Sequence, residues 1–523
     1  MAAASYTTDL TLIHACDAAS ASWTEPAAFA GGAITLPETD YFIQNTGCLS
    51  KNCGTTTPIG VGAIYNYGSA ATIPSPGAFM IWLFFGAPNT LDTQANGGLR
   101  VFCGSATTAY NQFYVRGSNT YEYGGWICIP VDPTVTPDAT VGAPTTTRQY
   151  FGAAAQIPGA NIASKGNPFG IDILRFGRCE ARMNGGDLAN GYATFNGFSA
   201  TNDSLTNRWG LIQSVQGGYL AQGLIVLGYT SAVDFRDSNK SIFIANTEKV
   251  ASGFNAIEIR QATSRVDFTN ITFTALGTVS RGNFITTNPA TTNITSCSFT
   301  DMGTFGFLSG STSIGTTFRR CNLITQSGST FTSCIIDSTN DATRAMLVND
   351  PGKITYCTFN SSGTKHAIEI TATGTTSFVG NVFNGYASGV SGTTGNEAIY
   401  NNSGGLVTLN VSGGATPSYR NGTNATTVIN STVTTTFTGL KDNTEVRVYA
   451  SGTTTELAGI ENATDGTTNN RSFSFGLSAG TVVDYRIHNL DYEIIEVYGY
   501  TIASTATALP IQQRTDRWYT NPA

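Results

Sequence analysis

The stretch ITSCSFTDMG (residues 294–303) recurs in altered form as ITYCTFNSSG (residues 354–363). Both begin with an apolar residue, two free positions, a Cys or other small or apolar residue, one free position and a second apolar residue. Between about residues 265 and 412 the pattern occurs as Phe268-x-x-Ile271-x-Phe273, Ile294-x-x-Cys297-x-Phe299, Phe318-x-x-Cys321-x-Leu323, Phe331-x-x-Cys334-x-Ile336, Ile354-x-x-Cys357-x-Phe359, Phe378-x-x-Asn381-x-Phe383 and Leu406-x-x-Leu409-x-Val411. The fourth position advances by 26, 24, 13, 23, 24 and 28 residues, so five of the six steps lie near 25.

A step near 25 residues suits one turn of a three-sided β-coil, because three short strands and three turns need roughly 20–28 residues. Coils stacked about 4.8 Å apart place like residues above one another. We therefore predict a right-handed parallel β-helix with an interior column of Cys297, Cys321 and Cys357, capped by Asn381. The 13-residue step to Cys334 fits no whole coil: either Cys334 lies on a different face, or the register breaks there.

A leucine-rich repeat has a similar period and is the alternative fold for this region. Such repeats are dominated by Leu and follow each strand with helical or compact segments. Here the intervening stretches, such as GTVSRGNFITTNPATT (residues 277–292), are rich in Gly, Thr and Asn and carry no helix formers in phase. The sequence favours the β-helix.

The flanking regions predict two further β domains, so the fold class is all-β. Residues 1–184 alternate short apolar or aromatic strands with Gly, Pro and Asn turns, as in an antiparallel sandwich or jelly roll. Residues 185–421 form the β-helix, with clear repeats at 265–412. Residues 422–523 form a small β-sandwich with a polar tail, in which Trp518 and Tyr519 either dock on a neighbouring subunit or fray with the chain end.

Composition excludes several functional classes. Charged residues make up 12% of the chain, against roughly 25% in typical domains, and the net charge is −7. No Lys or Arg cluster is longer than a pair such as Arg319-Arg320, so the basic patch of a nucleic-acid binder is missing. The longest apolar run, residues 79–85 (FMIWLFF), is far shorter than the roughly 20 residues of a membrane helix, and we read it as a buried strand.

The N-terminus and the cysteines point to production in the cytoplasm. The opening residues MAAASY have no basic region followed by an apolar one, so they do not form a secretory signal. Ten Cys at irregular spacing are then expected to be reduced thiols. We interpret the Cys column as core packing, since Cys is often buried as a small hydrophobe.

No catalytic, cofactor or metal site is predicted. Glycoside cleavage needs two carboxylates about 5–10 Å apart, and no carboxylate repeats at equivalent coil positions. The best acidic cluster, Asp337, Asp341 and Asp350, reads as a turn in which Asp bonds its own backbone. The three His lie far apart in the chain, whereas zinc needs three or four converging ligands.

Aromatic residues of the first domain offer a candidate glycan site. Tyr121, Tyr123 and Trp126 lie in YEYGGW (residues 121–126), at a turn where rings could be exposed as sugar-stacking platforms. The alternative is that they belong to the sandwich core, and for Trp82 we favour the core.

The coil segments ITSCSFTDMG and ITYCTFNSSG, and the C-terminal stretches GLKDNTEVRVYASGTTTELAGIENATDG (residues 439–466) and PIQQRTDRWYTNPA (residues 510–523), resemble virion proteins of tailed phages. The resemblance is to fibre, tailspike and capsid decoration proteins, and it covers most of the chain as a pattern without a catalytic motif. It implies a virion-surface structural protein that forms homotrimers and binds other capsid or tail proteins, with host surface glycan as a further partner. The alternatives are a tailspike depolymerase that cleaves surface polysaccharide and a non-enzymatic receptor- or glycan-binding module.

Overall fold

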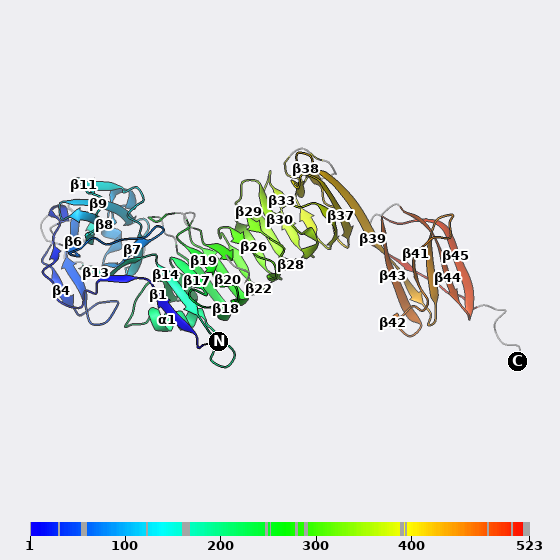
Figure 1. The fold of residues 1–523 in the computed structure, drawn as a ribbon, viewed down its shortest axis with the longest axis horizontal. Coiled ribbons are helices and arrows are strands. Elements are labelled where there is room, and N and C mark those ends of the chain that lie inside the picture. Colours follow the sequence, from blue (N-terminus) through cyan, green and yellow to red (C-terminus); the bar gives the residue numbers. More distant parts are fainter. Residues whose placement is uncertain are drawn as a thin grey trace. The chain divides into compact units, whose positions relative to one another are not determined.

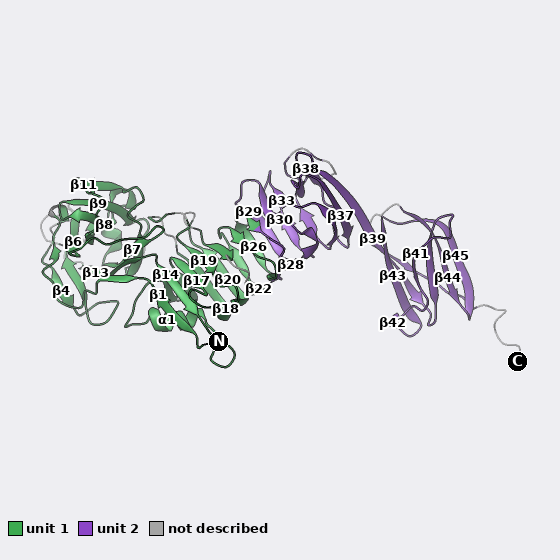
Figure 2. Ribbon diagram, in the orientation of Figure 1, with its two compact units in different colours: residues 1–312, 316–324 green, residues 313–315, 325–523 purple. Residues whose placement is uncertain are grey.

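The computed structural model describes residues 2–29, 32–53, 60–121, 124–158, 168–245, 249–251, 253–277, 281–286, 291–387, 392, 395–478, 481–503 and 506–515. They are almost entirely strands and turns, as the all-β prediction requires. The chain divides into two compact units, residues 1–312 with 316–324 and residues 313–315 with 325–523 (Figure 2). Within these ranges, no helix has the length and apolar character needed to cross a membrane.

The N-terminal part of the first unit forms two antiparallel six-stranded sheets (Figure 1). One contains β10 (Ile127–Val131), β7 (Ala78–Phe85), β13 (Pro168–Gly177), β5 (Cys48–Asn52), β4 (Thr35–Glu38) and β2 (Thr11–His14). The other contains β11 (Ala139–Val141), β9 (Ala109–Arg116), β8 (Leu99–Ala106), β12 (Tyr150–Gln156), β6 (Gly60–Asn66) and β3 (Trp23–Thr24). The sheets share one hydrophobic core, in which Phe79 and Phe85 of β7 meet Phe113 and Phe151. The apolar run at 79–85 is therefore the buried strand that the sequence predicted.

The rest of the first unit consists mainly of parallel ladders. One ladder runs through β14 (Glu180–Asn184), β17 (Leu224–Leu227), β19 (Ala256–Ile259), β21 (Asn283–Thr286) and β24 (Phe305–Gly306), and β1 (Ser5–Thr8) adds to β14 antiparallel. The other contains β15 (Ile212–Val215), β16 (Gly218–Ala221), β18 (Asp234–Ile244), β20 (Arg265–Ala275), β22 (Thr291–Thr295), β23 (Ser298–Thr300) and β26 (Thr317–Cys321). Helix α1 (Phe195–Asn202) lies between β14 and β15 in the chain. The first of these two ladders thus begins at β14, slightly before residue 185, and β1, the first strand of the chain, is also part of it.

The second unit continues with parallel pairs before it becomes antiparallel. Its parallel strands are β28 (Thr330–Thr332), β31 (Ile354–Thr355), β29 (Ile335–Thr339), β32 (Thr358–Asn360), β35 (Val382–Asn384), β30 (Arg344–Val348), β33 (His366–Ile370), β36 (Ile399–Asn401), β38 (Tyr419–Asn421), β34 (Gly374–Val379) and β37 (Leu406–Ser412). The strand β39 (Thr426–Leu440) pairs parallel with β37 along its first half and antiparallel with β43 (Asn470–Ser478) along its second. The divisions between the two units fall within β25 (Thr312–Ile314) and β27 (Ile324–Thr325).

The C-terminal part of the second unit has a hydrophobic core of its own, between two sheets. The strands β42 (Asp465–Thr467) and β46 (Thr507–Pro510) join the sheet of β39 and β43. A four-stranded sheet has the order β41 (Glu456–Ile460), β40 (Glu445–Ala450), β44 (Val482–Asn489) and β45 (Tyr492–Thr501). Phe437 of β39 packs against Tyr485 of β44, with ring centroids 4.7 Å apart, so the two sheets share a core.

A left-handed residue recurs in the coils, directly before the fourth position of the motif. These corner residues are Asn239, Asn270, Ser296, Gly315, Ser333, Tyr356 and Gly380, with φ between 52° and 71°. The left-handed region is costly for most L-residues and is tolerated best by Gly and Asn. At Ser296, Ser333 and Tyr356 the corner explains the motif: an apolar residue packs inward before it, a buried Cys follows it, and a second apolar residue packs inward in the next strand.

The register corrects the predicted column at Cys321. Phe299 pairs with Phe318, and their rings stack 5.3 Å apart, so Phe318 occupies the sixth motif position and not the first. The backbone N–H of Thr317 donates to the carbonyl of Cys297 at 2.9 Å, which makes the fully buried Thr316 the equivalent of Cys297. Cys321 therefore lies five residues beyond the column. The prediction failed because Phe is found at both the first and the sixth motif positions, and Phe318 was assigned to the first.

The same correction removes the 13-residue anomaly at Cys334. In the second unit the N–H of Thr358 donates to the carbonyl of Cys334 at 2.8 Å, and that of Val382 to the carbonyl of Cys357 at 2.9 Å. Cys334, Cys357 and Asn381 are thus successive fourth positions. Val411 pairs with Phe378, so the next fourth position is Gly414 and not Leu409. The column runs through residues 297, 316, 334, 357, 381 and 414, in steps of 19, 18, 23, 24 and 33 residues.

Candidate functional site

Of the three predicted glycan residues, Tyr121 lies in the core. Its side chain is only 5% exposed and belongs to the cluster shared by the two N-terminal sheets. Its hydroxyl donates to the carbonyl of Gly125 and accepts from the N–H of Gly125 at 3.0 Å. The expectation of an exposed ring at Tyr121 is therefore wrong: the residue holds the turn together. Trp82, expected in the core, is buried and donates through Nε1 to the carbonyl of Arg208. Tyr123 lies outside the described residues.

Trp126 is half-buried in an aromatic group that the sequence did not reveal. Its ring lies 5.6 Å from that of Phe84 and 6.4 Å from that of Tyr41. A Cβ at Gly170 would approach the Trp126 ring to 3.0 Å, so this glycine lets the indole lie against β13. Strand alternation in FMIWLFF could have placed Phe84 on the face opposite the core. Tyr41 comes from a loop distant in sequence and carries no such signal.

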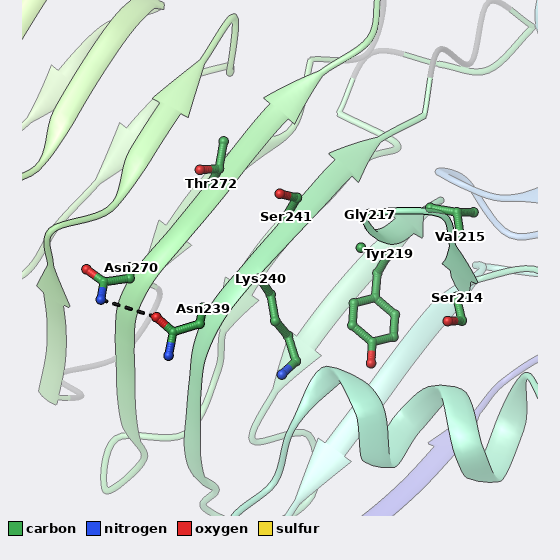
Figure 3. Close-up of a pocket in the computed structure, with 10 residues that line it drawn as sticks. Ser214, Val215, Gly217, Tyr219, Asn239, Lys240, Ser241, Asn270 and Thr272 are labelled. Carbon is green, nitrogen blue, oxygen red and sulfur yellow. Dashed lines mark hydrogen bonds between the residues drawn. The ribbon is translucent and has the colours of Figure 1, made fainter.

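A polar groove in the first unit is a further candidate site, separate from these aromatics (Figure 3). It has a volume of about 490 Å³ and is lined by Ser214, Val215, Gly217, Gly218, Tyr219, Asn239, Lys240, Ser241, Asn270 and Thr272. The hairpin β15–β16, whose turn contains Gly217 at φ 87°, forms one wall, and the neighbouring strands β18 and β20 form the other. Two corner residues, Asn239 and Asn270, therefore belong to the lining.

Hydrogen bonds position the polar groups of this groove. The amide of Asn270 donates to Oδ1 of Asn239 at 3.2 Å, and the hydroxyl of Tyr219 donates to Oδ1 of Asn196 on α1 at 3.1 Å. Lys240 Nζ pairs with Asp237 at 2.9 Å. Figure 3 shows the side chains of Tyr219 and Lys240 directed toward the same side of the strands. Burial raises the pKa of Tyr219, so its phenol stays protonated and acts as a donor.

The groove can bind but has no acid and base of its own. Its ten lining residues supply hydroxyls, amides, one amine and one phenol, and none of them is a carboxylate. Two-carboxylate glycoside cleavage cannot be built from them. Among the described residues, no group of three or more His, Cys, Asp and Glu converges as a metal site requires. The sequence signal that could have found the groove is the residue before the fourth motif position, which is Asn at both 239 and 270.

The carboxylates of Asp234 and Asp267 lie close together on the parallel ladders. Arg236 Nε contacts Oδ1 of Asp234 at 2.8 Å and Oδ2 of Asp267 at 3.5 Å, and Arg265 also pairs with Asp267 at 2.9 Å. The guanidinium of Arg236 lies over the ring of Tyr192, 4.1 Å from its centroid. Arg236 therefore bridges the two carboxylates. Asp234 was missed because it precedes the clear repeats.

The predicted acidic cluster is a turn at Asp341 but not at Asp337, which lies within strand β29. Asp341 accepts from the N–H groups of Thr343 at 2.9 Å and Arg344 at 3.0 Å, which is the local bonding expected of a turn aspartate. Although burial opposes the change, these hydrogen bonds hold the pKa of Asp341 below its usual value. Asp337 instead accepts from the Asn360 amide at 3.3 Å, on the neighbouring strand. The reading of a turn is confirmed for Asp341.

The cysteines are buried, and they also bond to the backbone. All ten are buried free thiols. Burial raises the pKa of Cys297 to about 11 and that of Cys103 to about 12, which keeps these thiols protonated and unreactive. At the fourth position the Cys334 thiol donates to the carbonyl of Ser313 at 3.3 Å, and the Cys297 sulfur accepts from the N–H of Ile271 at 3.5 Å. The column is therefore core packing with a polar function at each corner.

Comparisons with known proteins do not assign a family. No protein-family model matches the chain, and no curated protein matches it. Among solved structures, the chain is similar to one described as the crystal structure of the Agl-KA catalytic domain, with 11% identity and a TM-score of 0.15. The match covers 80% of this chain and 99% of that one. A likeness this weak carries no argument about fold or activity.

Proposed function

We propose that this chain is a structural protein of a tailed-phage virion, exposed on the particle surface as a fibre, spike or decoration component and assembled as a homotrimer. The finer fold goes with this proposal: a jelly-roll-type sandwich, a right-handed parallel β-helix and a small C-terminal sandwich. The resemblance of the coil segments to phage virion proteins is its first support.

The observation that carries the proposal is that polar side chains on neighbouring coils form hydrogen bonds with one another. In the first unit the Asn293 amide donates to Asp267 at 2.7 Å and accepts from the Thr312 hydroxyl at 2.9 Å. In the second unit the Asn384 amide donates to Asn360 at 3.0 Å, and that of Asn430 donates to Asn410 at 3.0 Å. Such rung-to-rung ladders tie neighbouring strands together. They suit a scaffold whose outer faces serve stability.

The interior supports the same role. Rings stack from coil to coil, with Phe273 and Phe299 4.9 Å apart in the first unit and Phe359 and Phe383 5.2 Å apart in the second. Close-packed aromatic stacks bury large areas and favour one fixed register. A spacer or scaffold on a particle needs this rigidity, whereas catalysis does not.

Locating the chain in a cryo-EM map of the intact phage particle tests the proposal. We expect density for three copies around a threefold axis, outside the capsid or tail. Light scattering of the purified full chain should give three times the chain mass. Particles without this chain, or a monomer at micromolar concentration, would contradict the virion assignment and the trimer respectively.

The second candidate function is a polysaccharide depolymerase, which the proximity of Asp234 and Asp267 favours. Both contact Nε of Arg236, at 2.8 and 3.5 Å, so the two carboxylates lie close together, as the acid pair of a glycosidase must. Host capsule or lipopolysaccharide incubated with the chain should then release new reducing ends, and Asp267→Asn should abolish the release. Asp301→Asn, which removes an ion pair with Arg320 elsewhere on the coils, is the matched control.

The third candidate is non-enzymatic glycan binding, which the groove of Figure 3 supports because its lining offers hydroxyls, amides and a phenol without a carboxylate. Trp126 offers a half-buried aromatic face in the same unit. Glycan-array binding that is lost in Tyr219→Ala or Trp126→Ala, without cleavage, would favour this function over the other two.

A further inference from the structure

The outer face of the C-terminal sheet β41–β40–β44–β45 carries aromatic and charged side chains in line. Val483, Tyr485 and Ile487 of β44 face the core, so Asp484 and Arg486 lie on the opposite face. Tyr449 of β40 pairs with Asp484, and Arg486 pairs with Glu496 of β45. Two strand spacings separate β40 from β45, which amounts to roughly 10 Å across the face.

A β-bulge in β45 presents an aromatic ring at this point. Val483 pairs with Tyr500 and Tyr485 with Val497, so Tyr498 and Gly499 together lie opposite Asp484. Gly499 has φ 70°, the left-handed conformation that favours glycine in such bulges. Tyr498 is 73% exposed, an unusual state for a tyrosine on a regular strand. Bulges often re-aim a side chain beside a functional site.

The carboxylate of Asp484 fixes the bulge to the turn that follows β40. It accepts from the N–H of Gly499, the N–H of Gly452 and the hydroxyl of Ser451, each at 2.8 Å. These bonds hold the pKa of Asp484 below its usual value, so the group remains a charged acceptor at neutral pH. The position of Tyr498 relative to the turn is therefore fixed without any ligand.

A groove of about 450 Å³ lies at this place, lined by Tyr449, Thr453, Thr454, Asp484, Tyr485, Arg486, Glu496 and Tyr498. Each charged group of the lining already has a partner within the protein: Glu496 accepts from the Tyr498 hydroxyl at 2.9 Å and pairs with Arg486 at 3.4 Å, and Asp484 is bonded to the turn and the bulge. The guanidinium of Arg486 has five N–H donors, of which this pair uses Nε. The groove thus offers ring faces, hydroxyls and further donors without demanding an ion.

We infer that this groove binds a neutral polysaccharide chain through Tyr498 and Tyr449. The apolar C–H face of a sugar ring stacks on an exposed aromatic ring, while the sugar hydroxyls need both donors and acceptors at the rim. Two tyrosines on strands roughly 10 Å apart, with Asp484 between them, suit more than one sugar unit along the face. Asp484 is a positioning residue, since its oxygens are engaged with the turn and the bulge. The inference does not depend on the virion assignment.

Affinity electrophoresis of the full chain tests this site. Native gels would contain one of four neutral polysaccharides: dextran, yeast mannan, laminarin or hydroxyethyl cellulose. We expect at least one to retard the wild-type chain. Tyr498→Ala and Tyr449→Ala should each weaken that retardation by about tenfold in apparent dissociation constant, as loss of a central aromatic contact does. Tyr356→Ala, which removes a tyrosine that is 59% exposed on the coils, is the matched control and should leave it unchanged.

Three outcomes would overturn the inference. They are no retardation by any of the four polysaccharides, retardation that Tyr498→Ala and Tyr449→Ala leave intact, and stronger retardation by dextran sulfate than by dextran. The last would identify an anion site. Circular dichroism of each variant separates a lost contact from a lost fold, and Tyr498→Phe, which keeps the ring, should retain binding. None of these results depends on where the chain lies in a particle.

Discussion

Replacing Asn381 with Ala tests the role of the fourth motif position. The Asn381 side chain is 2% exposed, and its two polar atoms bond the backbone of one neighbouring segment on either side of the corner at Tyr356. Oδ1 accepts from the N–H of Cys357 at 2.9 Å, and Nδ2 donates to the carbonyl of Ile354 at 2.8 Å. A corner interrupts the regular ladder, so these backbone groups depend on the side chain for their partners.

The cost of Asn381→Ala can be worked from these two bonds. A buried backbone group left without its partner costs about 1–3 kcal/mol. Two such groups lead to an expected loss of about 2–5 kcal/mol in the free energy of local opening. Because 1.4 kcal/mol is a tenfold change, amides near the site should exchange with solvent about 30-fold faster or more.

Hydrogen-exchange mass spectrometry of peptides covering residues 354–384 is the direct assay, since it reads local opening within a long chain. Asn384→Ala is the matched control: it removes the same residue type three positions away, where an exposed amide donates to Asn360 at 3.0 Å. Its effect should stay within about 0.5 kcal/mol. If the two variants exchange alike, the fourth position is merely a small packing residue, and our account of the Cys, Thr and Asn column is refuted.

Three further predictions concern buried groups and corners. Burial raises the pKa of Asp203 to about 7, so the folded chain binds this proton more tightly than the unfolded chain does. The folded state therefore loses stability as the pH rises from about 4 to 7. Calorimetry should show a melting temperature that falls between pH 5 and 7, and Asp203→Asn should flatten this fall. Gly380→Ala places a methyl 2.3 Å from the Tyr356 ring at φ 71° and should cost about 1–3 kcal/mol in urea denaturation. Ellman's reagent should label none of the ten thiols within minutes, and all ten in guanidinium.

Each of these has an outcome that contradicts it. A melting temperature that rises between pH 5 and 7 in the wild type would mean that Asp203 is ionised in the fold. Gly363→Ala, at φ 99° with open space around it, should cost less than Gly380→Ala; equal losses would show that the ring of Tyr356 is not the obstacle. Rapid labelling of even one thiol without denaturant would place that cysteine at the surface.

The repeat indicated strands that pair in a regular series because burial restricts residue type strongly. Phe299, Phe359 and Cys357 occupy interior positions where only apolar or small residues fit, so their spacing survives in the sequence. The assignment of residues to motif positions was less certain, since Phe318 fits two interior positions equally well. Only the pairing of Phe318 with Phe299 decides between them, and that pairing is a property of three-dimensional register.

The candidate sites were harder to predict. Tyr121 and Trp126 lie five residues apart, yet one is buried and the other half-buried, because Tyr121 packs in the core shared by the two sheets whereas Trp126 packs against Phe84. Tyr219 and Asn239 come together through a hairpin lying beside a parallel strand. Tyr498 is exposed because a single bulge shifts the alternation of β45. The local sequence gives little indication of either the hairpin contact or the bulge.

The strand β39 determines how a pulling force would pass through the second unit. Its residues Thr426–Thr432 are bonded to β37, and the same unbroken backbone then enters the C-terminal antiparallel sheet. No flexible linker separates the two pairings. Tension applied at the C-terminal sheets would load the seven residue pairs between β37 and β39 along the strand direction, so that their hydrogen bonds resist shear together and do not unzip one after another. A surface-mounted protein that meets drag or a tethered ligand gains mechanical resistance from such a joint.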